Sequence, residues 1–169
     1  MSKANITLRE LTFADTAVIA NLANNKNIWD NVRDRMPFPY KEEDAENFIK
    51  LVLKEDGPEV RAIVQEGVLK GLIGLHPASD VYRGTAELGY WIGEPYWGQG
   101  LASAAVEQMI PIAFEKMKLR RIDASVYEHN RASMRILEKN GFVREGVARA
   151  AVIKNGVVLD EVRFGLLRK

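Results

Sequence analysis

Residues 93–102 read Gly-Glu-Pro-Tyr-Trp-Gly-Gln-Gly-Leu-Ala and are the most informative stretch of the chain. A strand-like run over 86–92 precedes them, and a helix-like run from Leu101 to Met117 follows. Gly98 and Gly100 let the backbone approach a ligand closely, and the first turn of the helix adds unpaired N–H groups and the positive end of its dipole. The stretch therefore predicts an anion-binding turn made of main chain, for which a diphosphate is a frequent occupant.

Two other phosphate-binding patterns fit these residues less well. A P-loop would need Lys and Ser or Thr after Gly98, where Gln99 and Gly100 stand. A dinucleotide-binding loop would need a third glycine at Ser103 and would follow the first strand, although Asp123 lies at the usual spacing for the acidic residue. A nucleotide-binding oxidoreductase and a glycine turn that binds nothing both stay open as alternatives.

Composition and charge narrow the class of protein. The 169 residues are most simply one domain, 1–169, with 47% hydrophobic and 28% charged residues. A net charge of +1 gives no general attraction to nucleic acid or membrane surfaces, so neither is an expected partner. Cysteine is absent, and His76 and His129 lack a metal-ligand pattern, so no metal is expected.

Targeting signals are not evident in the sequence. The first ten residues have no apolar run long enough for a signal peptide, and no stretch approaches the ~20 apolar residues that span a bilayer. These observations predict a cytoplasmic protein.

Hydrophobic periodicity and turn residues predict an α/β fold with one mixed, twisted sheet of about seven strands and about four helices. The expected order is β-α-α-β-β-β-α-β-α-β-β. Strands are expected near 6–11 and at 60–66, 68–75, 85–92, 121–126, 142–153 and 157–167. Helices are expected from Thr12 or Asp15 to about 24, and at 43–55, 101–117 and 131–140. Two prolines in 29–40 predict an extended loop there.

Proline and glycine positions add local expectations. Pro111 lies inside the predicted helix 101–117, so this helix should bend or break there. The dipeptides Glu66-Gly67 and Asn155-Gly156 predict tight turns between neighbouring strands. The buried stripe of helix 101–117 is expected to comprise Leu101, Ala105, Met109 and Ile112.

The element order and two motifs resemble the GNAT superfamily of acyl-CoA-dependent N-acetyltransferases, in particular its branch of ribosomal-protein N-terminal (alanine) acetyltransferases. The first motif, Q/R-x-x-G-x-G/A in the superfamily, reads Trp97-Gly-Gln-Gly-Leu-Ala102 here. The second, N-x-x-S/A-x-x-L-Y-x-x-x-G-F, resembles the run from Asn130 to Phe142. Trp97 replaces the usual Gln or Arg, as is common in this branch. The general-acid Tyr of many members is replaced by Leu137.

The resemblance implies acetyl-CoA as co-substrate and assigns cofactor-binding residues. The backbone N–H of Ile92 would contact the acyl or pantetheine carbonyls, and Asn130 would face the pantetheine arm while also capping a helix. The diphosphate would be held by backbone N–H groups of Trp97, Gly98, Gln99, Gly100, Leu101 and Ala102. The resemblance also places the 29–40 loop over the amine acceptor, which makes its larger side chains candidates for substrate binding, with plain loop packing as the alternative: Trp29, Arg33, Phe38 and Tyr40.

Catalysis would require a neutral amine and a stabilised leaving thiolate. An α-amine costs roughly 1–1.5 kcal/mol to deprotonate at pH 7, and a lysine about 4.5 kcal/mol. Glu87 is the candidate base, acting through water, and a paired strand carboxylate is its alternative. Asp160 and Glu161 are weaker candidates for the base. Ser133 is the candidate donor to sulfur, and its alternative is a small polar residue in a capped helix turn.

The leading hypothesis is therefore direct acetyl transfer from acetyl-CoA to a primary amine, including the N-terminal α-amine of a ribosomal or other protein. A small amine, such as an antibiotic, a polyamine or an amino acid, is the alternative acceptor. A CoA-binding module without activity is the alternative from another class, supported by Leu137. The sequence leaves a homodimer open.

Overall fold

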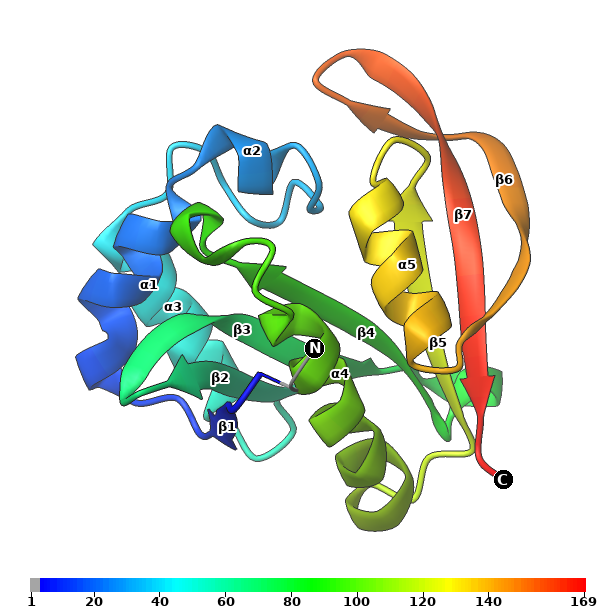
Figure 1. Cartoon of the computed structure of the whole chain (residues 1–169), viewed down its shortest axis with the longest axis horizontal. Coiled ribbons are helices and arrows are strands. Elements are labelled where there is room, and N and C mark those ends of the chain that lie inside the picture. The colour runs from blue at the N-terminus through cyan, green and yellow to red at the C-terminus, as the bar shows by residue number, and fades with distance from the viewer. Residues whose placement is uncertain (1–3) are drawn as a thin grey trace. The chain divides into compact units, whose positions relative to one another are not determined.

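The computed structural model describes residues 4–169 and contains one seven-stranded mixed sheet, ordered β1-β2-β3-β4-β5-β7-β6 (Figure 1). Residues 1–3, which form part of the start considered for a signal peptide, lie outside the described residues. β4 and β5 are parallel, and the pairs β1–β2, β5–β7 and β6–β7 are antiparallel. The strands are β1 Thr7–Arg9, β2 Glu59–Gln65, β3 Val68–Pro77, β4 Thr85–Ile92, β5 Arg121–Tyr127, β6 Val143–Lys154 and β7 Val157–Leu167.

Five α-helices accompany the sheet in the described residues: α1 Thr16–Ala23, α2 Lys26–Trp29, α3 Glu42–Val52, α4 Leu101–Pro111 and α5 Arg131–Lys139. Three 3₁₀ turns (η1 Phe13–Asp15, η2 Asp80–Tyr82, η3 Glu94–Tyr96) and a π-helical turn (η4 Ile112–Lys116) complete the elements. The predicted fold class, one mixed sheet of seven strands with helices, is confirmed, and the order of elements along the chain differs from the predicted order in detail. The additional helix is α2, whose four residues are too few to show a helical hydrophobic stripe in the sequence.

Contacts divide the chain into two compact units. The first runs up to Gly74 and continues over Tyr90–Ala105, and the second comprises Leu75–Gly89 and Val106–Lys169. The prediction of a single domain over 1–169 stays a prediction.

The first unit is built on β1, β2 and the helices that pack beside them. β1 pairs with β2 so that Leu8 lies opposite Ile63. α3 contributes Ala45 and Ile49, which are fully buried. These side chains join residues of α1, β2 and β3 in one apolar core, which includes Leu11, Ile19, Ala20, Ala23, Tyr40, Val60, Ala62, Val64, Leu69 and Leu72.

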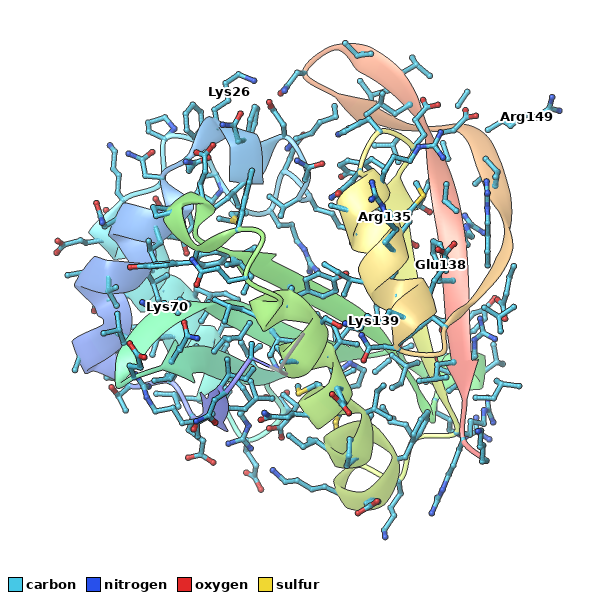
Figure 2. The ribbon with its side chains drawn as sticks, viewed as in Figure 1. Lys26, Lys70, Arg135, Glu138, Lys139 and Arg149 are labelled. Carbon is cyan, nitrogen blue, oxygen red and sulfur yellow. The ribbon has the colours of Figure 1, made fainter. Side chains whose placement is uncertain are left out.

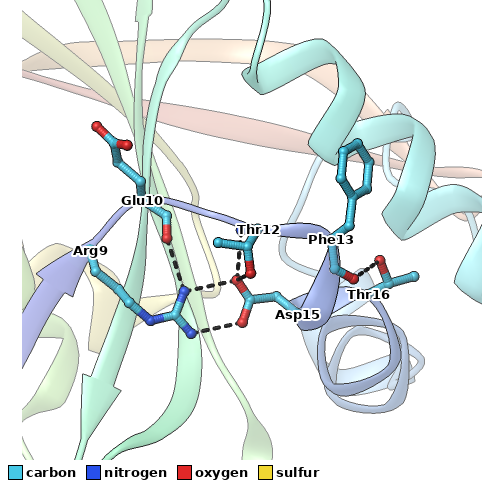
Figure 3. Close-up of polar contacts among 6 residues, drawn as sticks. All are labelled: Arg9, Glu10, Thr12, Phe13, Asp15 and Thr16. Atoms are coloured by element: carbon cyan, nitrogen blue, oxygen red, sulfur yellow. Dashed lines mark hydrogen bonds and ion pairs between the residues drawn. The ribbon is translucent and has the colours of Figure 1, made fainter.

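An ion pair ties the end of β1 to the start of the first helical turn (Figure 3). Both carboxylate oxygens of Asp15 accept from the Arg9 guanidinium, at 2.7 and 2.8 Å, and one also accepts from the Thr12 backbone N–H at 2.9 Å. Asp15 is buried, and these hydrogen bonds, chiefly the one from Arg9, hold its pKa below the usual value. The helix start predicted at Thr12 or Asp15 is confirmed, with η1 leading into α1.

The second unit is centred on β5, which pairs with β4 on one side and β7 on the other. The edge strand β6 is joined to β7 by the predicted Asn155-Gly156 turn, where both residues have positive φ (52° and 74°). Such φ values are typical of the two-residue turn that joins strands with native twist. β6 also carries two irregularities in register, and Ala150 has φ 51° within the second.

The helix that follows residue 100 changes its winding at Pro111. Because proline has no N–H to donate, the α-helical ladder ends there, and the next turn closes with the bond from the Met117 N–H to the Ile112 carbonyl at 2.9 Å. The wider turn buries Ala113 fully and leaves Ile112 half-buried. The predicted stripe is therefore correct for its first three members and wrong at Ile112.

Candidate active site

The glycine turn, Trp97–Ala102, lies between the short turn η3 and the start of α4 in the first unit. Gly98 and Gly100 have φ values of 75° and 76°, which L-residues rarely adopt. A Cβ atom placed on either glycine would meet nothing within 4 Å. The backbone conformation, and not the packing of neighbours, is therefore what requires glycine at these positions.

The Trp97 N–H donates to the Glu94 carbonyl at 3.1 Å, so this amide is already bonded and its predicted contact with the diphosphate stays a prediction. The five N–H groups that follow it in the turn differ in this respect. Within the described residues 4–169, the amides of Gly98–Ala102 donate to no other backbone carbonyl. Gly98, Gln99 and Gly100 are exposed, and α4 begins immediately after them at Leu101. Five amide donors and the positive end of an 11-residue helix together favour an anion with several oxygens.

Trp97 has a structural role that the sequence did not indicate. Its indole N–H donates to the Ile92 carbonyl at 2.7 Å, although 47% of the residue is exposed. The bond joins the last residue of β4 to the first residue of the glycine turn. A tryptophan can therefore hold this turn where other members of the resembled family have Gln or Arg.

Two further contacts secure η3 and the end of β4. The Gly93 N–H donates to the Lys70 carbonyl on β3 at 2.8 Å, and the Lys70 ammonium lies 3.8 Å from the centre of the Tyr96 ring (Figure 2 labels Lys70). Gly71 is required by space, because a Cβ atom there would collide with the Trp91 carbonyl oxygen. Sequence reasoning missed Lys70 and Gly71, since neither belongs to a local motif.

Two side-chain contacts lie within the 29–40 segment. The Trp29 and Phe38 rings are stacked with centroids 5.4 Å apart, and the Trp29 indole N–H donates to the Met36 carbonyl at 3.0 Å. Tyr40 belongs to the apolar core, where burial raises its pKa to about 12, which favours the packing alternative for this side chain. Arg33 is exposed. The assignment of these four residues to the acceptor stays a prediction.

The remaining residues predicted for catalysis and cofactor binding lie in the second unit. The Asn130 side chain accepts from the Ser133 backbone N–H at 3.1 Å, so Asn130 is the N-cap of α5, as predicted. Glu87 is half-buried on β4, opposite Asp123 of β5 in register. Leu137 is fully buried, so the face of α5 that would present a tyrosine hydroxyl is part of the core here.

The charged residues of α5 lie on its exposed side, including Arg135, Glu138 and Lys139 (Figure 2). Among residues 4–169, no three His, Cys, Asp or Glu side chains form a group that could hold a metal ion.

In the described part of the chain, every helix is too short or too polar to cross a membrane. The catalytic roles predicted for Glu87 and Ser133 stay predictions.

Comparison with known proteins identifies the family. Residues 5–143 match the family described as the acetyltransferase (GNAT) domain. The chain belongs to the GNAT family. Among GNAT relatives, it is 36% identical over 107 residues to the "putative ribosomal N-acetyltransferase YdaF" of Bacillus subtilis, an alignment that covers 63% of this chain but only 58% of YdaF.

Two more GNAT proteins cover a larger share of both chains. The "ribosomal-protein-serine acetyltransferase" of Escherichia coli is 30% identical over 126 residues, which is 73% of this chain and 70% of that protein. The crystal structure of spermidine N-acetyltransferase from Vibrio cholerae "in complex with CoA and spermine" superposes with a TM-score of 0.83 at 26% identity, covering 96% of this chain and 95% of the other. GNAT relatives of this chain are thus named for both protein and polyamine acceptors.

Proposed function

We propose that this GNAT protein is an N-acetyltransferase that moves an acetyl group directly from acetyl-CoA to a primary amine. The observation that carries the proposal is the glycine turn, whose five amides from Gly98 to Ala102 are not used by the backbone of the described chain. This donor set suits the diphosphate of CoA, because its charge is met by N–H groups and a helix N-terminus without a metal. When bound, acetyl-CoA supplies an activated acetyl thioester.

The chain's own residues would then orient the acyl group, accept a proton and stabilise the leaving sulfur. The backbone N–H of Ile92 would orient the acyl or pantetheine carbonyl, and such orientation lowers the entropic part of the barrier. Glu87 would accept the proton of the amine through water. Asn130 would contact the pantetheine arm, and the Ser133 hydroxyl would donate to sulfur. The roles of Asn130 and Ser133 follow from their positions in the second motif, and the role of Ile92 follows from the family resemblance. The role of Glu87 follows from its place on the strand before the glycine turn.

We propose the N-terminal α-amine of a protein as the acceptor. Two relatives named for ribosomal-protein acetylation support this choice. The chemistry supports it as well, because deprotonating an α-amine at pH 7 costs about 3 kcal/mol less than deprotonating a lysine. A polyamine is the competing acceptor, supported by the spermine-bound structural neighbour.

One observation favours a second candidate function, a CoA-binding module without transferase activity. Leu137 occupies the position of the usual general acid and is fully buried. If the protein is an active transferase, protonation of the leaving thiolate depends on Ser133 or on solvent, because Leu137 cannot donate a proton.

The two functions are separated by measuring CoA binding and turnover on the same preparation. Calorimetry with CoA should give saturable binding, and thiol release from acetyl-CoA should be faster with peptides that begin in Ser or Ala than with spermine. The variant Glu87→Gln should lower kcat by about 100-fold without changing CoA affinity. CoA binding without thiol release for any acceptor would support the non-catalytic module, and absence of CoA binding would refute both functions.

A further inference from the structure

Glu94 connects two parts of the first unit that are far apart in the sequence. It is the first residue of η3, just before the glycine turn. Its carboxylate accepts from the Asn25 side-chain amide at 2.5 Å and from the Asn27 side-chain amide at 2.8 Å, across 69 and 67 positions of sequence. Each carboxylate oxygen has its own amide donor, so the pair of bonds fixes the orientation of the Glu94 side chain.

Asn25 has a second partner, and this partner determines which way its amide points. Its side-chain oxygen accepts from the Ile28 backbone N–H at 3.1 Å and so caps α2. Its nitrogen is thereby left to donate to Glu94, and the two contacts agree on one orientation of the amide. The Ile28 side chain is buried. Asn25 therefore joins the start of α2 directly to η3.

The residues of η3 and those next to it are also held by strands β3 and β4. The Gly93 amide is bound to the Lys70 carbonyl of β3, and Tyr96 lies beneath the Lys70 ammonium. Trp97 is bound to Ile92 at the end of β4. Glu94 therefore lies in a turn that is held in place by the strands. Its two hydrogen bonds fix α2, and with it the start of the 29–40 segment, relative to this turn.

We propose that Glu94 is a positioning residue that aligns the acceptor-binding 29–40 segment with the CoA-binding glycine turn. The inference rests on the proposed function, because it assumes that the 29–40 segment binds the amine. The carboxylate suits this role because a glutamate is ionised at neutral pH and offers one acceptor oxygen to each amide. The same hydrogen bonds, chiefly the one from Asn25, lower its pKa further. Loss of the hydrogen bonds from Asn25 and Asn27 to Glu94, which form the link between α2 and η3, should weaken acceptor binding more than CoA binding.

The test exchanges donor and acceptor at the contact. Asn25→Asp keeps a good N-cap for α2 but places a carboxylate against Glu94. Glu94→Gln alone leaves one acceptor oxygen for two amide donors, so one of the two bonds, to Asn25 or to Asn27, is lost. The double variant restores a complementary pair, since the new amide at position 94 can donate to the new carboxylate at position 25 while its oxygen still accepts from Asn27.

Each single variant should raise the KM for the amine acceptor by about 10-fold, with kcat and the Kd of CoA within about 2-fold of the parent. The double variant should bring the KM back close to the parental value. Lys50→Met is the matched control: Lys50 pairs with Glu46 inside α3, at 2.6 Å and away from the 29–40 segment, so its loss should leave the acceptor KM unchanged.

Deuterium uptake of residues 26–40 provides a second readout that does not need catalysis. Uptake should be faster in each single variant and return to the parental rate in the double variant. If the parent protein transfers no acetyl group, the proposed function fails, and the exchange data alone decide whether the link orders the segment. Unchanged KM and unchanged uptake in the single variants, or failure of the double variant to recover, would overturn the inference.

Discussion

At the scale of single residues, the glycine turn depends on backbone conformation that only glycine adopts at low cost. Gly98 has φ 75° with open space where a Cβ would be, and Gly67, in the tight turn between β2 and β3, has φ 76° with the same open space. The two positions are therefore equivalent for stability. They differ in place, because only Gly98 belongs to the run of available amides.

This equivalence gives a matched pair of substitutions. Gly98→Ala and Gly67→Ala should each lower the free energy of unfolding by about 1–2 kcal/mol, since an L-residue is strained at these angles. Only Gly98→Ala should weaken CoA binding, by about 10-fold or more, because relief of the strain turns amide donors away from the diphosphate. Urea denaturation and calorimetry with CoA measure the two effects. Equal CoA affinity in both variants would show that the glycine turn is not the diphosphate site.

At the scale of secondary structure, asparagine side chains decide where two helices begin. Asn25 caps α2 through the Ile28 N–H, and Asn130 caps α5 through the Ser133 N–H. The Asn130 cap is local and was predictable, because acceptor and donor are three residues apart. For Asn130 the cap and the proposed contact with pantetheine can be separated by choosing the substitution.

Asn130→Ala should lower the free energy of unfolding by about 1 kcal/mol, because the first turn of α5 loses its acceptor. Asn130→Asp should keep that stability, since a carboxylate caps equally well. Both variants should raise the Kd of CoA if the amide also contacts the pantetheine arm. Thermal denaturation and CoA titration check the two parts, and a Kd unchanged in both variants would leave Asn130 with the cap as its only role.

At the scale of the whole molecule, stability should depend on pH through buried carboxylates more than exposed ones. Asp15 is buried against Arg9, and this contact lowers its pKa. Glu145 also has a lowered pKa, caused mainly by hydrogen bonds from Arg121, but its side chain is 42% exposed. Solvent screens the exposed pair, which contributes about 0.2–1 kcal/mol.

The pH dependence follows from the sign of the Asp15 shift. Because its pKa is lower in the folded state, its contribution is complete above the unfolded pKa of about 3.9 and is lost as pH falls through the folded value. Asp15→Asn should cost about 2 kcal/mol at pH 7 and flatten the loss of stability in acid. Glu145→Gln, the exposed counterpart, should have a much smaller effect on the stability at pH 7 and on the loss of stability in acid. Urea midpoints from pH 7 to pH 2 would contradict this if the Asp15 variant kept the parental acid slope.

Local sequence was sufficient for much of the fold and for the centre of the candidate site. The strand 85–92, the Asn155-Gly156 turn, the left-handed glycines and the Asn130 cap were all predictable, because each depends on residues a few positions apart. The Pro111 interruption was predictable for the same reason. The site of α2 was not, because four residues carry no periodic signal.

Sequence alone thus determined the order of the strands and of the longer helices along the chain, together with the backbone of the glycine turn, because these features depend on local steric and hydrogen-bonding rules. Only the tertiary structure decided which contacts hold that turn in place. These are the hydrogen bonds from Asn25 and Asn27 to Glu94 and the contact of the Lys70 ammonium with the Tyr96 ring. It also revealed the close approach of β3 and β4 that requires Gly71. These partners lie far apart in the sequence, and a contact between distant residues exists only once the chain has folded.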